Sequence, residues 1–177
     1  MRAVVGLGNP GPEYAATRHN AGFLLADAVA GHWQFPPFRR AERARATEGT
    51  VGGTPVRILK PTTFMNRSGA ALASLRADPT FTPARDLLIL VDDFQIPLGT
   101  FRFRPDGSAG GHNGLKSIEG SLQSQQYARL RIGVGPLPEG AGDWADYVLA
   151  PFAPEELEQI TVLAPRMIEE IEKWLKS

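Results

Sequence analysis

Hydrophobic and polar residues along this chain recur with two different periods, one typical of strands and one typical of helices. A continuous aliphatic run over 87–91 predicts a central strand that is covered on both faces. Alternation over 100–104 and 128–134 predicts two further strands, each with one face toward a core. Apolar residues at helical spacing over 154–175, with Pro154 near the first turn, predict a long amphipathic helix that closes the chain.

The remaining segments alternate between the same two kinds of element. Gly52 and Gly53 separate two strand-like runs and predict a hairpin, and Asn20 stands where a helix N-cap is expected. Such alternation favours an α/β protein, a single three-layer α/β/α domain with a mixed central sheet that spans residues 1–177. The other predicted elements are strands over 3–7, 44–51 and 55–59, helices over 20–33, 70–77 and 113–122, and loops over 34–43 and 135–146.

The composition is that of an ordinary globular protein. The 177 residues, 42% of them hydrophobic and 21% charged, suffice for one domain with a sizeable core. Because the sequence has no cysteine, it has no disulfide framework, thiol nucleophile or cysteine-based metal site. The N-terminus lacks the long apolar segment of a signal peptide, and the aliphatic run over 87–91 is too short to cross a bilayer. We therefore expect a cytoplasmic protein.

Charge is balanced overall but uneven locally. The 19 basic and 19 acidic residues give a formal net charge of zero, whereas proteins held to nucleic acid by charge alone are usually more basic. Each basic strip taken alone is most simply a solvated face, but local strips on a neutral molecule suit an anionic partner that is bound and then released. The strips are Arg39, Arg40, Arg43 and Arg45, then Arg102 and Arg104, then Arg129 and Arg131.

The loop that follows the first predicted strand matches a nucleotide-binding motif. Its Gly6-x-Gly8-x-x-Gly11 spacing is that of the dinucleotide fingerprint. Pro10 and Pro12 argue against that function, because proline has no N–H to offer a pyrophosphate. The next helix also begins too late, and no acidic residue follows about 20 residues on. The alternative is a glycine turn that lets strand and helix pack closely.

Side chains that can carry chemistry concentrate where predicted strands end. His19 and His112 lie in such loops, and the pair Asp92-Asp93 ends the aliphatic strand. Each of these residues alone fits a turn or a cap, but jointly they predict one cleft at the carboxyl edge of the sheet. All four asparagines of the sequence belong to the same set of loops and helix starts: Asn9, Asn20, Asn66 and Asn113.

Such a cleft offers amides, a titratable base and a carboxylate. No activated nucleophile is evident, since neither Ser68 nor Ser108 lies in a Gly-x-Ser-x-Gly motif. No His-x-x-x-His pair is present, although the two loop histidines and the aspartate pair leave a metal site as an alternative. The favoured scheme is a histidine that takes a proton from water, a carboxylate that orients it, and amides that hold a carbonyl.

Four blocks of the sequence, in order along the chain, resemble bacterial peptidyl-tRNA hydrolases. The blocks are Gly6-Leu7-Gly8-Asn9-Pro10-Gly11-x-x-Tyr14 with Thr17-Arg18-His19-Asn20-x-Gly22, Lys60-Pro61-x-Thr63-Phe64-Met65-Asn66-x-Ser68-Gly69, Asp92-Asp93 before Pro97-x-Gly99, and Gly110-Gly111-His112-Asn113-Gly114-Leu115-Lys116-Ser117. The resemblance implies an enzyme that cleaves the ester between a peptide and the 3′ ribose of tRNA, recycling tRNA from aborted translation. It implies peptidyl-tRNA as the partner and no metal or organic cofactor. We also expect a monomer with no membrane partner.

The resemblance implies a role for each matching residue. His19 matches the catalytic base, Asp92 the carboxylate that orients it, and Asn9 the amide beside the scissile ester. Relatives often carry His-Asp-Glu where this chain has Val91-Asp92-Asp93, and we align Asp92 with the orienting carboxylate. The other matches are Asn66 and Asn113 for the peptide and the attacking water, Tyr14, Phe64 and Met65 for the apolar lining, and Arg102, Arg104 and Arg131 for tRNA phosphate.

An RNA-binding module without catalysis is a different class of function for the same cleft. A binder needs no base, and its surface should be richer in exposed aromatic residues and lysine. His19 in the loop that follows Asn9 therefore favours the enzyme. A nucleotide-dependent enzyme built on the Gly6 motif is the third alternative, and protection by NAD or ATP would reveal it.

Overall fold

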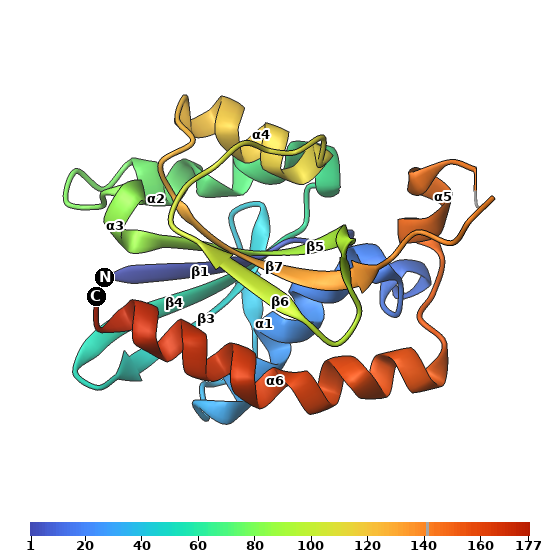
Figure 1. The fold of residues 1–177 in the computed structure, drawn as a ribbon. Helices are drawn as coiled ribbons and strands as arrows, with labels where there is room; N and C mark the ends of the chain where they lie inside the picture. The colour runs from blue at the N-terminus through green and yellow to red at the C-terminus, as the bar shows by residue number, and fades with distance from the viewer. Residues whose placement is uncertain (141) are drawn as a thin grey trace.

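A computed structural model describes residues 1–140 and 142–177 and shows a mixed seven-stranded sheet between layers of helices (Figure 1). The strand order is β2-β3-β4-β1-β5-β7-β6. This arrangement confirms the predicted α/β class with a mixed central sheet. The strands are β1 (Arg2–Gly6), β2 (Arg39–Ala41), β3 (Ala44–Val51), β4 (Thr54–Pro61), β5 (Leu87–Pro97), β6 (Phe101–Arg104) and β7 (Ala128–Gly135).

The four central strands run parallel, so their carboxyl ends meet at one edge of the sheet. β1 pairs with β4 and with β5, and β5 pairs with β7, all in parallel. The outer strands are antiparallel, with β3 on β4, β2 on β3 and β6 on β7. Loops that leave β1 and β4 therefore lie near the outer part of β5, where parallel α/β sheets bind their ligands.

Helices cover both faces of the sheet. Figure 1 shows α6 along one face, α4 over the other, and α5 beyond the carboxyl edge. The helices are α1 (Ala21–His32), α2 (Ala73–Arg76), α3 (Pro83–Asp86), α4 (Asn113–Leu122), α5 (Trp144–Leu149) and α6 (Pro154–Leu175). Three 3₁₀ segments complete the set: η1 (Pro12–Tyr14), η2 (Arg18–Asn20) and η3 (Met65–Leu72).

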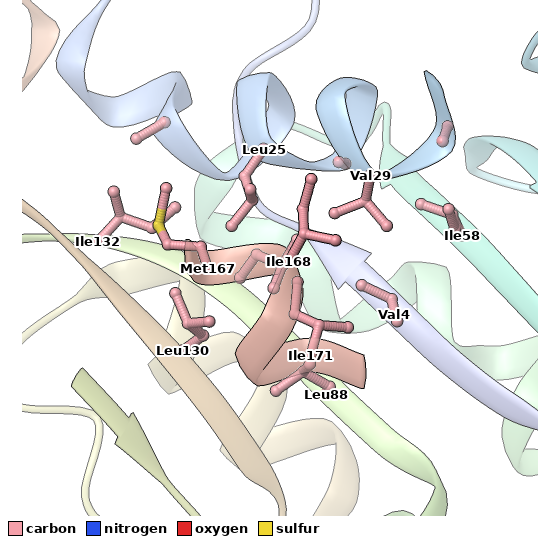
Figure 2. Close-up of a cluster of buried hydrophobic side chains, with 14 of the residues drawn as sticks. Val4, Leu25, Val29, Ile58, Leu88, Leu130, Ile132, Met167, Ile168 and Ile171 are labelled. Carbon is pink, nitrogen blue, oxygen red and sulfur yellow. The ribbon is translucent and has the colours of Figure 1, made fainter. Parts of the chain in front are cut away.

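Alternate residues of the central strands point to opposite faces and build two cores. The core beneath α1 and α6 contains Val4, Leu88, Leu130, Leu25, Val29, Met167, Ile168 and Ile171 (Figure 2). The core beneath η3 and α4 contains Val5, Ile89, Val91, Leu72 and Leu115. Because both faces are covered, the central strands must be apolar at every position, which explains the aliphatic run at the start of β5.

β5 is longer than the sequence predicts. It continues past the aspartate pair to Pro97, with a change of register between Asp93 and Pro97. Asp92 therefore lies within the strand rather than at its end. Backbone pairing with β7 extends the strand through residues that lack the aliphatic pattern.

Three shorter elements also differ from the prediction. The expected loop over 34–43 contains the edge strand β2, and the expected loop over 135–146 leads into α5, with Ala141 outside the described residues. The predicted helix over 70–77 begins in the 3₁₀ segment η3 and becomes α-helical only in α2, from Ala73 to Arg76. These segments are too short to show a periodic apolar pattern, so neighbouring elements decide their conformation.

The two chain ends lie side by side at the opposite end of the sheet from α5 (Figure 1). The Arg2 guanidinium donates to the carbonyls of Trp174 at 2.9 Å and Ser177 at 2.7 Å, which ties β1 to the end of α6. Among the described residues, the structure contains no helix with both the length and the apolar character of a membrane span.

Candidate active site

Three side chains from three segments form a hydrogen-bonded chain at the carboxyl edge of the sheet. The Asp92 carboxylate on β5 contacts Nδ1 of His19 through Oδ2 at 2.8 Å and Nε2 of His112 through Oδ1 at 2.9 Å. His19 belongs to η2, and His112 directly precedes α4. The ring centroids of the two histidines lie 4.9 Å apart. The fold thus brings His19 and Asp92 together and adds His112 to them.

Hydrogen bonds place the proton of His112 on one nitrogen. As the N-cap of α4, His112 accepts through Nδ1 from the backbone N–H groups of Gly114 at 3.0 Å and Leu115 at 3.3 Å. A nitrogen that accepts hydrogen bonds carries no proton, so Nε2 of His112 carries the proton and donates it to Asp92. His112 is therefore a neutral donor that holds one oxygen of the carboxylate.

The other oxygen of Asp92 sets the tautomer of His19. An ionised carboxylate only accepts hydrogen bonds, so Nδ1 of His19 donates and Nε2 keeps a lone pair in the neutral ring. Burial would by itself raise the pKa of the Asp92 carboxyl, because this residue is only 3% exposed. The positive charge that His112 and His19 carry when protonated, together with their hydrogen bonds, outweighs burial and holds that pKa well below its usual range. Asp92 is consequently ionised at neutral pH.

The same three residues lie close enough together to be considered as metal ligands. A metal ion needs a lone pair from each ring, and His112 would have to give up its last ring proton to provide one. Its Nδ1 already accepts two backbone N–H groups, so the doubly deprotonated ring would be required. This donor set fits proton transfer better than metal binding.

Asp93 points to different partners from those of Asp92. Its Oδ1 accepts from the backbone N–H of Gln95 at 2.8 Å, and its Oδ2 lies 3.5 Å from Nη1 of Arg131. Among the described contacts, Asp92 is therefore the member of the pair that meets the histidines. This geometry supports the alignment of Asp92 with the orienting carboxylate.

A network of amides holds Asn9 next to η2. The side chain of Asn20 accepts from the Asn9 backbone N–H and donates to the Asn9 carbonyl, both at 2.9 Å. The Oδ1 of Asn9 accepts from the backbone N–H of Met65 at 2.7 Å. The Met65 N–H can only donate, so the amide atom of Asn9 that faces it must be the oxygen. The Nδ2 group of Asn9 therefore points away from Met65 and is available as a donor.

Asn20 occupies the predicted N-cap position of α1, but its side chain does not cap that helix. Asn20 makes no side-chain hydrogen bond to the first turn of α1. Its amide is instead used on both backbone groups of Asn9, 11 residues earlier in the chain. A buried amide satisfies more donors and acceptors in this reciprocal pair than it would as a cap.

Close packing explains the glycines of the first loop. A Cβ on Gly6 would lie 2.3 Å from the carbonyl oxygen of Gly22, and one on Gly8 would lie 2.6 Å from the ring of Phe23. α1 begins only at Ala21, after two 3₁₀ segments, so the loop does not open a helix N-terminus. A dinucleotide site requires such a terminus, and the geometry therefore favours the packing interpretation of the motif.

Tyr14 and Phe64 form an aromatic wall near the amide network. Their ring centroids are 6.3 Å apart with the planes at 83°. Phe64 is 50% exposed, and its backbone has φ 64° and ψ 157°, a conformation that favours glycine. Met65, the third residue of the predicted lining, is buried in the core with η3 and α4, and its backbone N–H contacts Asn9.

Asn66 and Asn113 are exposed, and each directly follows a residue of the hydrogen-bonded network. Asn66 comes after Met65 on η3, and Asn113 comes after His112 at the start of α4. These two elements pack together, with the Gly69 N–H donating to Ser117 Oγ at 2.9 Å. The structure therefore brings both amides to the same side of the sheet.

Arg102, Arg104 and Arg131 lie on the last two strands of the sheet. Arg102 and Arg104 are exposed on β6, and Arg102 is the register partner of Arg131 on β7. Arg131 is less accessible, because it donates to the Ser108 carbonyl at 2.9 Å and lies beside Asp93. A short cationic row therefore crosses the sheet from its edge toward the Asp92 segment.

Arg129 does not belong to a basic surface strip, and the sequence-based grouping with Arg131 is wrong. Arg129 is fully buried and donates to the carbonyls of Ser108, Gln125 and Tyr127. It fixes the start of the glycine-rich loop that leads to His112. Successive side chains of a strand point to opposite faces of the sheet, and Arg129 lies on the face of β7 that is covered on the α4 side.

The sequence predicts that Asn20 and His112 lie in the cleft, but the family resemblance implies no catalytic role for either residue. The available signal is position, since His112 stands two residues before Gly114 and three before Leu115, where an N-cap side chain is expected. The partner that gives His112 its function, Asp92, lies 20 residues earlier in the chain. No local pattern predicts that contact.

A buried carboxylate, an imidazole with one free nitrogen and a fixed amide are groups that suit a class of hydrolases in which a general base activates water. Ser68 is fully buried and donates to the Met65 carbonyl at 2.8 Å, so it offers no nucleophile.

Comparison with known proteins identifies the family within this class. The family model described as peptidyl-tRNA hydrolase matches residues 3–177, and the chain belongs to that family. It is 46% identical over 177 residues to a peptidyl-tRNA hydrolase of Gemmatimonas aurantiaca, covering 99% of this chain and 93% of that protein. Identity to the protein of the same name from Gloeobacter violaceus is 45% over 176 residues, with 99% and 88% covered.

Solved structures agree with this assignment. The crystal structure of peptidyl-tRNA hydrolase from Acinetobacter baumannii matches this fold with a TM-score of 0.90 at 30% sequence identity. The match covers 99% of this chain and 89% of that one. The family resemblance seen in the sequence is therefore confirmed.

Proposed function

We propose that this protein is a peptidyl-tRNA hydrolase that cleaves the ester between a peptide and the 3′ ribose of tRNA, so that tRNA from aborted translation is recycled. The observation that carries the mechanism is the pairing of His19 with the ionised, buried Asp92. That pairing leaves Nε2 of His19 as a base, and no serine or cysteine nucleophile is needed.

The proposed reaction begins when Nε2 of His19 takes a proton from a water that attacks the ester carbonyl carbon. Asp92 stabilises the imidazolium that forms, and the Nδ2 group of Asn9 donates to the carbonyl oxygen as negative charge develops there. When the tetrahedral intermediate collapses, the bond to the ribose oxygen breaks and that oxygen takes the proton from His19. The products are a peptide with a free carboxyl group and deacylated tRNA.

The two halves of the substrate are assigned to different parts of the carboxyl edge. Asn66 and Asn113 suit the peptide backbone and the attacking water, because an amide both donates and accepts hydrogen bonds. Tyr14, Phe64 and the segment around Met65 provide the apolar lining. We assign to Arg102, Arg104 and Arg131 the neutralisation of tRNA phosphates.

The proposed steps use only side chains of this chain, and we propose neither a metal nor an organic cofactor for them. We further propose that residues 1–177 act as one catalytic domain, that the protein works as a monomer, and that it works in the cytoplasm, where translation supplies its substrate. The molar mass of the protein in solution, measured at the concentration used in the activity assay, tests whether it is a monomer.

The decisive experiment measures release of free peptide from a labelled peptidyl-tRNA in the presence of a metal chelator. The wild-type protein should release peptide, and His19→Ala should reduce turnover by roughly 10²- to 10⁴-fold while tRNA binding is kept. His32, an exposed histidine at the end of α1, provides the matched control His32→Ala, which should be unaffected. Near-normal turnover in His19→Ala would contradict the mechanism, and tRNA binding without any release by the wild type would favour a binding module.

A further inference from the structure

A recess next to His19 opens toward β7, away from the β1 and β4 loops that carry Asn9 and Asn66. We propose that this recess binds the 3′-terminal nucleoside of the tRNA, an inference that rests on the proposed hydrolysis of peptidyl-tRNA. Its cavity volume of about 70 Å³ admits only part of a nucleoside, so the base would lie at the rim. Besides the catalytic groups, the lining includes Phe94, Gln95, Gly110, Gly111, Arg131 and Trp144.

Two aromatic rings at the rim provide a stacking surface for a base. Phe94 on β5 and Trp144 on α5 have nearly parallel rings, 9° apart, with centroids separated by 5.9 Å. Both side chains are half-buried, so each keeps exposed surface at the recess. Single-stranded RNA ends are commonly recognised by bases stacked on such rings.

Polar groups beside the rings match the edge of a purine. The Gln95 amide is exposed on the strand next to Phe94, and it can donate to and accept from an adenine edge at the same time. Gly110 and Gly111, with φ of 59° and 85°, put bare backbone at the other wall, where a ribose can approach closely. This combination of ring, amide and glycine backbone suits a nucleoside better than an aliphatic side chain.

The strand order assigns the recess to the RNA half of the substrate. Phe64 and Asn66 follow β4, and the sheet continues in the order β4-β1-β5-β7-β6. Arg131 on β7 lines the recess, and its register partner Arg102 lies on the next strand. The ester joins the peptide on one side to the ribose on the other. With the ester at His19, the terminal nucleoside falls on the arginine side.

The helix that carries Trp144 is tied to the segment that carries His19. The Arg18 guanidinium lies 4.1 Å from the centre of the Tyr147 ring on α5 and donates to the Tyr147 carbonyl at 3.1 Å. The Tyr147 hydroxyl donates to the Val134 carbonyl at 2.6 Å. These contacts fix the position of Trp144, and of a base stacked on it, relative to the imidazole of His19, the residue after Arg18.

The test compares deacylated tRNA that ends in CCA with the same tRNA lacking its terminal adenosine, both bound to the full chain at one fixed salt concentration. The wild type should prefer the complete tRNA, and Trp144→Ala should reduce that preference by roughly 5- to 150-fold, the range for loss of one stacked base. Trp144→Phe, which keeps a ring, should retain most of it. Trp33→Ala is the matched control, because Trp33 is another half-buried tryptophan, hydrogen-bonded to Glu172.

Each outcome decides the inference. An unchanged preference for the complete tRNA in Trp144→Ala overturns it, and so does a change confined to selectivity among peptides with different C-terminal residues. If Trp144→Ala does not fold, the exposed variant Gln95→Ala should weaken the preference for a terminal adenosine over other terminal nucleosides, and no change there overturns the inference. These binding measurements involve no cleavage. Failure of the wild type to hydrolyse peptidyl-tRNA is therefore a separate result that concerns the proposed function.

Discussion

His19 and His112 carry the same ring and meet the same carboxylate, yet their hydrogen bonds give them different chemistry. His19 contacts Asp92 through Nδ1 and keeps a lone pair on Nε2, whereas both nitrogens of His112 are already committed. A ring with no free nitrogen cannot take a proton from water. Of these two histidines, only His19 is placed to act as the base.

Asp92 and Asp93 can be separated by matched variants. Asp92→Asn should lower turnover, because the tautomer of His19 is less well fixed and its imidazolium loses a partner. The loss should be smaller than in His19→Ala, since the base itself remains. Asp93→Asn should do much less, because Asp93 faces Gln95 and Arg131. Initial rates of the two variants under identical conditions provide the measurement, and a larger loss in Asp93→Asn would reverse the assignment.

The depressed pKa of Asp92 also predicts how stability responds to acid. The carboxyl has a lower pKa in the folded protein than in the unfolded chain, where the ordinary value is about 3.9. Its contribution to stability is therefore present above that pH and is lost as the pH falls from there through the folded-state pKa. Below about pH 4, the free energy of unfolding should fall more steeply for the wild type than for Asp92→Asn. Parallel denaturation curves for the two proteins would contradict this.

The backbone of Phe64 adopts a strained conformation. Its φ of 64° with ψ of 157° costs a non-glycine residue roughly 1–3 kcal/mol. Phe64→Gly should therefore be more stable than Phe64→Ala by roughly 1 kcal/mol, although glycine usually destabilises a fixed backbone. Both variants remove the ring that packs on Tyr14, so each serves as the control for the other. Urea unfolding midpoints decide the order, and a more stable alanine variant would show that the position is not strained.

Among the elements, α4 is the helix whose stability is linked to the active site, because its N-cap residue, His112, also contacts Asp92. The His112 side chain satisfies N–H groups of the first turn with one nitrogen and holds Asp92 with the other. The start of this helix therefore determines where the carboxylate points.

Two substitutions at His112 separate its two functions. His112→Asn should keep the cap, because asparagine is a good N-cap residue, but it loses the donor to Asp92. His112→Ala loses both, so it should be less stable than His112→Asn by roughly 0.5–2 kcal/mol. Turnover should fall in both variants to a similar extent. Thermal unfolding and initial rates measured on the same preparations test this, and full activity in His112→Asn would remove His112 from the site.

At the scale of the whole molecule, exposed arginines lie at both edges of the sheet, and the site lies between them. Arg39 and Arg40 belong to β2 at one edge, and Arg102 and Arg104 belong to β6 at the other. Only the β6 pair adjoins Arg131, which lines the recess beside His19. The two edges should therefore contribute differently to tRNA binding.

Salt dependence distinguishes the two edges. The double variant Arg102→Ala, Arg104→Ala should flatten the slope of log affinity for tRNA against log salt by up to about two units, one for each phosphate that is no longer neutralised. Arg39→Ala, Arg40→Ala removes the same charge from the opposite edge and should leave the slope unchanged. An unchanged slope in the first variant would exclude the β6 arginines from binding phosphate.

Local periodicity in the sequence predicts several strands and helices, and it places the candidate catalytic side chains between them. The predicted bounds of β3, α4 and α6 match the structure, because hydrophobic period and turn residues act within each segment. The sequence also located His19 and Asn113 in segments that follow strands. The family followed from the same loops, whose residue order is visible without any fold.

The role of each of these side chains depends on contacts that arise only in the folded chain. His19 and Asp92 are 73 residues apart in the chain, and His112 and Asp92 are 20 apart, so strand order rather than local pattern brings them together. The two hydrogen bonds between Asn20 and Asn9 and the burial of Arg129 likewise depend on the fold and not on a local pattern. The physical reason is that a hydrogen bond or a buried charge depends on the partner that the fold supplies, whereas sequence pattern reports only which face of a local element is apolar.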